Sequence, residues 1–113
     1  MQVYNVQLTL EVKPDYPYDE AMMKSKVLVV TKKYFDVIKT CAHSFVEGAF
    51  TFIVILAESH LVMHTYPELN RVYISFEFHE EDVNNKKIQD NRFVEELTNN
   101  LEGVAIDFHK RER

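Results

Sequence analysis

Apolar and polar residues alternate over several stretches of the chain, and this alternation predicts most of its elements. Between positions 2 and 12, Tyr4, Val6, Leu8 and Leu10 alternate with polar neighbours, which is the pattern of a half-buried β-strand. Further strands are predicted where β-branched and aromatic residues alternate or cluster. They are expected over Phe35–Val46, Phe50–Leu56, His60–Tyr66, Val72–His79 and Val104–His109.

Two other segments favour helices. Asp19 and Glu20 begin the first, where negative charge stabilises a helix N-terminus, and we expect about four turns from there. The Val-Leu-Val-Val centre of this segment also fits a strand, so that alternative stays open. In the second segment, Arg92–Leu101, apolar residues recur on one side of a helix, and Gly103 follows where a C-terminal cap belongs.

The element order β-α-β-β-β-β-α-β determines the expected fold class. Most strands are joined by short links, which favours antiparallel pairing; the polar stretch Glu80–Asp90 is the longest predicted loop. We therefore predict an α+β protein, a two-layer α/β sandwich with a mainly antiparallel sheet and two helices on one face. No repeat or linker divides the sequence, so residues 1–113 are expected to form a single domain, with Lys110–Arg113 as a solvated tail.

Composition removes several classes of function. The 13 Lys and Arg against 18 Asp and Glu give a net charge of −5, which disfavours nucleic acid as a partner and suits a small cationic substrate. Two glycines are too few for a glycine-rich phosphate loop, and one cysteine excludes an internal disulfide. No stretch is apolar for long enough to span a membrane and the N-terminus has no signal-peptide pattern, so we expect a soluble, cytoplasmic protein.

Five histidines raise the question of a metal site. His60 and His64 have the i, i+4 spacing of a helical zinc pair. Their segment is predicted to be a strand, however, and four residues of strand span about 13 Å, which is too far for two imidazoles on one ion. No metal site is therefore predicted.

The segment Glu58–Glu68, ESHLVMHTYPE, is the most specific part of the sequence. It resembles the ESH-xxx-HTWPE signature of the prokaryotic-type, pyruvoyl-dependent S-adenosylmethionine decarboxylases, with Tyr66 in place of Trp. The matching positions are Glu58, Ser59, His60, His64, Thr65, Pro67 and Glu68.

This resemblance implies a precursor that cleaves itself between Glu58 and Ser59. The Ser59 hydroxyl would attack the Glu58 carbonyl, and elimination from the resulting ester followed by loss of ammonia would leave a pyruvoyl group derived from Ser59. His64 matches the histidine credited with acid or base catalysis of processing, and Thr51 falls at the position of the family's processing serine. The pyruvoyl ketone would form a Schiff base with the substrate amine and act as an electron sink while carbon dioxide leaves.

The same resemblance implies a substrate site and a homodimer. Glu68 matches the glutamate that binds the substrate ribose, and Phe45 matches an aromatic residue that stacks on adenine. In an extended strand Ser59 and His64 would lie about 17 Å apart on opposite faces. Either the chain bends sharply after Ser59, or His64 serves a site shared with another strand or subunit. The family builds its sites partly at a dimer interface, so a homodimer is expected.

The chain departs from the family pattern at several positions. His79-Glu80 stands where the family has Cys-Gly, whose thiol is credited with reprotonating the α-carbon; His79 is our candidate for that role because histidine can donate a proton near neutral pH. Asn70-Arg71 replaces Gly-Tyr, and Ser75 replaces an Asp.

These departures leave three hypotheses about function. The first is an S-adenosylmethionine decarboxylase that serves spermidine synthesis. The second is a pyruvoyl-dependent decarboxylase of another amino acid, such as ornithine or arginine. The third is an uncleaved, non-catalytic paralogue that acts as a binding or regulatory subunit.

Cys41 is the chain's one cysteine, and it is expected to be a small buried residue rather than a substitute for the family thiol.

Overall fold

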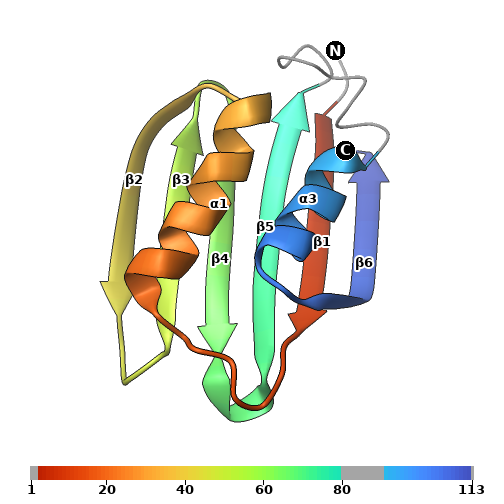
Figure 1. Cartoon of the computed structure of the whole chain (residues 1–113). Coiled ribbons are helices and arrows are strands. Elements are labelled where there is room, and N and C mark those ends of the chain that lie inside the picture. The colour runs from red at the N-terminus through yellow and green to blue at the C-terminus, as the bar shows by residue number, and fades with distance from the viewer. Residues whose placement is uncertain (1–2, 80–90, 113) are drawn as a thin grey trace.

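Six strands and two α-helices are formed by residues 3–79 and 91–112, which are the residues that this computed structural model describes (Figure 1). The predicted loop over residues 80–90 lies outside them. The elements are β1 (Val3–Glu11), α1 (Glu20–Tyr34), β2 (Val37–Ser44), β3 (Phe50–Leu56), β4 (His60–Tyr66), β5 (Arg71–His79), α3 (Arg92–Asn100) and β6 (Val104–Glu112), with a 3-10 turn at Pro67–Leu69.

The strands form one sheet in the order β2-β3-β4-β5-β1-β6, and every neighbouring pair is antiparallel. The first strand therefore lies between β5 and β6. Both helices pack on one face of this sheet (Figure 1). The predicted α+β fold with two helices on one face is confirmed. We call the other face, which neither of these helices covers, the open face.

The core lies between the helices and the sheet. In β1, Val6, Leu8 and Leu10 are buried, as their alternation with polar residues predicts, and alternate residues of β3, β4 and β5 join them. The helices contribute further buried side chains, which are Met23, Val27, Val30, Tyr34, Phe93, Val94 and Leu97.

The first helix forms in spite of its β-branched centre. The Asp19 side chain accepts a hydrogen bond from the backbone nitrogen of Met22, which caps the helix N-terminus. Met23, Val27 and Val30 then share one buried side at helical spacing, while Val29 is exposed. The strand alternative for this segment is therefore wrong, because burial of one helical side outweighs the β propensity of valine.

The last strand is longer than predicted. It continues to Glu112, which pairs with Tyr4, while Lys110 pairs with Val6. The Lys110 ammonium lies 5.1 Å from the centre of the Tyr4 ring, a cation–π contact. The prediction of a tail is therefore wrong for Lys110, Arg111 and Glu112, because β1 offers them a hydrogen-bonding edge, although the side chains of Arg111 and Glu112 are exposed as predicted.

Tyr16 connects the loop after β1 to the end of α3. Its hydroxyl donates a 2.7 Å hydrogen bond to the Leu101 carbonyl, and burial, followed by the nearby Glu102 carboxylate, raises the pKa of Tyr16 to about 12. The folded protein therefore disfavours the phenolate.

We expect the free energy of unfolding to fall as the pH rises from about 10 to 12, because an unfolded tyrosine ionises near pH 10 and the folded Tyr16 does not. Tyr16→Phe is expected to cost about 1 kcal/mol near neutral pH and to flatten this decline. Part of the decline should remain in this variant, because burial and Glu96 also raise the pKa of Tyr34 to about 12. Urea unfolding at several pH values measures both effects, and an unchanged pH slope in Tyr16→Phe would contradict the assignment.

Candidate functional site

A tight turn at Ala57–Ser59 connects β3 to β4. Its backbone is held by two hydrogen bonds, from Ala57 N to the Asp36 carbonyl at 3.1 Å and from Leu56 N to the Ser59 carbonyl at 2.9 Å. The Ser59 hydroxyl oxygen is buried and has no hydrogen-bond partner within the described part of the chain. A buried polar atom without a partner is uncommon and calls for an explanation, and a catalytic role is one such explanation.

His79, the last residue of β5, reaches this turn from the side. Its Nε2 atom lies 3.0 Å from the backbone carbonyl oxygen of Glu58, and an N–H at Nε2 would donate to that carbonyl. The carbonyl belongs to the peptide bond between Glu58 and Ser59. We call these residues, Glu58, Ser59 and His79, the cleavage cluster; the structure brings His79, predicted from a departure from the family pattern, to the bond that the signature predicts to be cleaved.

A second group of predicted residues lies at the other end of the β3–β4 pair. Thr51 and His64 are direct cross-strand partners, and Thr51 Oγ1 lies 2.8 Å from His64 Nδ1. They line an open pocket of about 560 Å³, which we call the Thr51 pocket. Its lining residues are Phe45, Val46, Ala49, Phe50, Thr51, His64, Thr65, Tyr66 and Glu68.

Thr65 organises the wall of this pocket, a role that its place in the sequence did not predict. Its buried hydroxyl accepts a hydrogen bond from Phe50 N at 2.9 Å and donates one to the Gly48 carbonyl at 2.7 Å. Gly48 has a φ of 79°, and a Cβ there would lie 3.1 Å from Pro67, so this tight turn requires glycine. The sequence did contain a signal for Thr65, because it is one of the matching positions of the Glu58–Glu68 signature.

The cleavage cluster and the Thr51 pocket are separate within one chain. His60 pairs with Ile55 at one end of β4 and His64 pairs with Thr51 towards the other. Since β4 is continuous from His60 to Tyr66, about 17 Å of strand separates Ser59 from His64. The chain turns before β4 and not within it, so a sharp bend after Ser59, one of the two predicted solutions, is not found.

The residues that depart from the family pattern have visible structural roles. Asn70 adopts the left-handed backbone conformation, with φ 55°. Asparagine tolerates this conformation better than most residues, so it replaces the family's glycine at little cost. Arg71 Nη1 binds the Glu11 carboxylate at 2.7 Å. Ser75 pairs with Val62 and with Gln7 in neighbouring strands. Glu80 lies outside the described residues.

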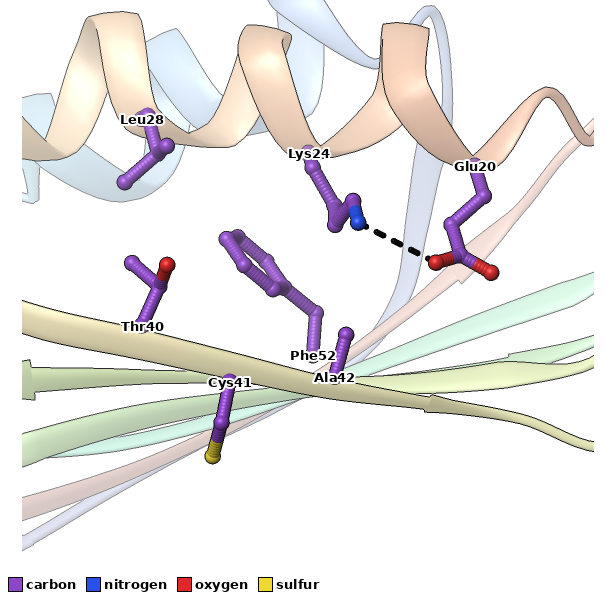
Figure 2. Close-up of a pocket in the computed structure, with 7 residues that line it drawn as sticks. All are labelled: Glu20, Lys24, Leu28, Thr40, Cys41, Ala42 and Phe52. Carbon is purple, nitrogen blue, oxygen red and sulfur yellow. Dashed lines mark hydrogen bonds and ion pairs between the residues drawn. The ribbon is translucent and has the colours of Figure 1, made fainter.

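Another pocket, of about 390 Å³, lies between α1 and strands β2 and β3 (Figure 2). Its Glu20 carboxylate accepts hydrogen bonds from Ser44 and from Lys24, and these bonds, Ser44 first, lower the pKa of Glu20. Figure 2 shows Cys41 pointing away from the helix, and its side chain is exposed. The expectation of a buried Cys41 is wrong, because its side chain points to the open face of the sheet, which neither helix covers. None of the predicted site residues lines this pocket.

Over residues 3–79 and 91–112, no group of three or more His, Cys, Asp or Glu side chains is arranged to hold a metal ion. No helix in the described part of the chain combines the length and apolar character needed to cross a membrane.

The fold and the site define a two-layer α+β protein. Its Ser59 hydroxyl is buried and follows the Glu58 carbonyl that the His79 imidazole contacts, and the Thr51 pocket lies apart from them. The family model for S-adenosylmethionine decarboxylase matches residues 10–113, and the chain belongs to that family. The adenosylmethionine decarboxylase from Aquifex aeolicus has a similar crystal structure, with a TM-score of 0.74 and 17% identity over 99% of this chain and 88% of that one. At this identity the likeness shows the fold. No sequence among the curated proteins matches the chain.

Proposed function

We propose that the chain is a self-processing, pyruvoyl-dependent decarboxylase that acts on S-adenosylmethionine in the cytoplasm and serves spermidine synthesis. The observation that carries this proposal is the cleavage cluster, in which the unpartnered hydroxyl of Ser59 follows the Glu58 carbonyl that His79 contacts. Membership of the decarboxylase family supports the class of reaction.

Self-cleavage uses only the chain and water. The Ser59 oxygen bonds to the Glu58 carbonyl carbon, the carbon–nitrogen bond breaks, and the hydroxyl proton ends on the freed amine, which gives an ester. Loss of the Ser59 α-proton and breakage of its Cβ–Oγ bond release Glu58 as a carboxylate. The dehydroalanine that remains adds water and loses ammonia, so that a pyruvoyl group begins the second chain.

Within the proposed active site the chain's residues bind and orient the substrate. The pyruvoyl group would supply an electron sink for decarboxylation. Glu68 would accept hydrogen bonds from the ribose hydroxyls, and the exposed Phe45 ring would stack on adenine. His79 would return a proton to the α-carbon. The net charge of −5 favours a cationic sulfonium substrate.

A homodimer would complete this site. Substrate contacts are proposed in the Thr51 pocket, yet the cleavage cluster of the same chain lies about 17 Å away along β4. A twofold axis through the open face would set the cleavage cluster of one chain against the Thr51 pocket of its partner. The partly exposed apolar side chains Ile55, Tyr66 and Tyr73 lie on strands that build this face, which supports an interface there.

The purified chain tests the proposed function directly. We expect denaturing electrophoresis and intact mass to reveal two chains, residues 1–58 and 59–113, the second blocked by a pyruvoyl group. Ser59→Ala should remain one chain. Carbon dioxide release is then compared for S-adenosylmethionine, ornithine and arginine. Release from ornithine or arginine alone would show a changed substrate, and a wild-type chain that stays intact would indicate a non-catalytic paralogue.

A further inference from the structure

We propose that His79 is a catalytic residue of self-cleavage, in which its Nε2–H group stabilises the negative charge that develops on the Glu58 carbonyl oxygen. This inference rests on the proposed function and goes beyond it, because it assigns His79 to the step that makes the pyruvoyl group. The role in decarboxylation inferred from the sequence concerns a later reaction.

The imidazole of His79 is already in place beside the reacting carbonyl. The Nε2 atom is 3.0 Å from the oxygen of the one carbonyl that Ser59 would attack, which is within hydrogen-bond range. When the Ser59 oxygen bonds to the carbonyl carbon, negative charge moves onto this oxygen. A donor that is already in place stabilises that charge without reorganisation, as donors in oxyanion holes do.

A purely structural role explains the contact less well. The turn is already held by hydrogen bonds from Ala57 N to Asp36 O and from Leu56 N to Ser59 O, on either side of Glu58. The imidazole therefore contacts the reacting carbonyl of a turn whose backbone has other anchors. The unpartnered Ser59 hydroxyl completes the arrangement, because no described hydrogen bond has to break before it attacks.

Cleavage would also change the surroundings of the imidazole. Once the Cβ–Oγ bond of Ser59 breaks, the Glu58 carbonyl becomes part of a new C-terminal carboxylate that is no longer covalently fixed beside His79. Nε2 is then released from its carbonyl partner. The His79 ring would therefore act first on the Glu58 carbonyl during self-cleavage. Only after cleavage would it be available to return a proton to the substrate.

The test follows cleavage of freshly synthesised full-length chains over time. His79→Phe keeps a planar ring but has no N–H donor, whereas His79→Gln keeps an amide N–H. We expect cleavage to be at least about 100-fold slower in His79→Phe, the usual effect of losing one oxyanion donor, and within about tenfold of wild type in His79→Gln. His109→Ala, which removes an exposed imidazole of β6, should cleave at the wild-type rate.

Two further measurements separate catalysis from folding. Each His79 substitution is also made in the uncleavable Ser59→Ala chain, whose thermal unfolding should change little. Hydroxylamine, which cleaves esters and leaves peptide bonds intact, should release no fragments from uncleaved His79→Phe, because the block precedes ester formation. Equal cleavage rates in wild type and His79→Phe, or an accumulated ester, would overturn the inference and leave the proposed function standing. An uncleaved wild-type chain would overturn both.

Discussion

A mixed dimer that joins a Ser59→Ala chain to a Phe45→Ala/Glu68→Ala chain is expected to recover about half of the wild-type decarboxylase activity, although neither variant is active by itself. The two chains carry different affinity tags, are expressed together and are purified over both. The dimer then contains one site in which the intact Ser59 of one chain faces the intact Thr51 pocket of the other. Its second site contains all three substitutions.

Each parent fails for its own reason. Ser59→Ala removes the hydroxyl from which the pyruvoyl group is made, so its activity should be zero. Phe45→Ala/Glu68→Ala still cleaves itself but loses base stacking and a charged hydrogen-bond acceptor. Together these are worth several kcal/mol, so kcat/KM should fall at least about 100-fold. Carbon dioxide release from labelled S-adenosylmethionine measures both.

A reciprocal arrangement is the control. When one chain carries all three substitutions and its partner none, sites shared between chains are both damaged, and activity should be nearly absent. If each site lay within one chain, the results would be exchanged: this second dimer would retain half of the activity and the first would have none. The pair of dimers therefore distinguishes the two geometries without a structure of the complex.

The fold was largely predictable because it follows from local patterns. Alternation placed Val6, Leu8 and Leu10 on the buried face of β1, and the acidic start at Asp19 marked the beginning of α1. The last strand was underestimated because its final residues are charged. What keeps them in the sheet is pairing with β1 and the contact of Lys110 with Tyr4, and neither is visible in a local pattern.

The site was predictable as a set of residues but not as an arrangement. The signature placed Glu58, Ser59 and His64 within a few positions of one another, yet a continuous strand holds His64 far from Ser59. His79 could be noticed only as a departure from the family, because its contact with the Glu58 carbonyl depends on the antiparallel pairing of β4 with β5. The pairing register of β4 with β5 brings His79 and Glu58 together, and the spacing of these residues in the sequence does not reveal that register.

Phe93→Ala is expected to produce the largest loss of stability, about 3–5 kcal/mol. The Phe93 ring is fully buried at the start of α3, with its centre 5.0 Å from that of Phe76, 5.2 Å from Phe35 and 5.3 Å from Tyr34. It therefore joins α3 to β5 and to the end of α1. Such a loss is a large fraction of the roughly 5–15 kcal/mol that stabilises a typical domain.

Urea unfolding of the Ser59→Ala chain, which remains covalently intact, measures this effect as a change in the unfolding midpoint. Phe108→Ala is the matched control, because the same side chain is removed from the edge strand β6, where Phe108 is 38% exposed. Its cost should stay below about 1 kcal/mol, as for most exposed positions. Equal losses at Phe93 and Phe108 would contradict a core concentrated between the helices and the sheet, since both substitutions delete the same ring, one from the buried core and one from an exposed edge.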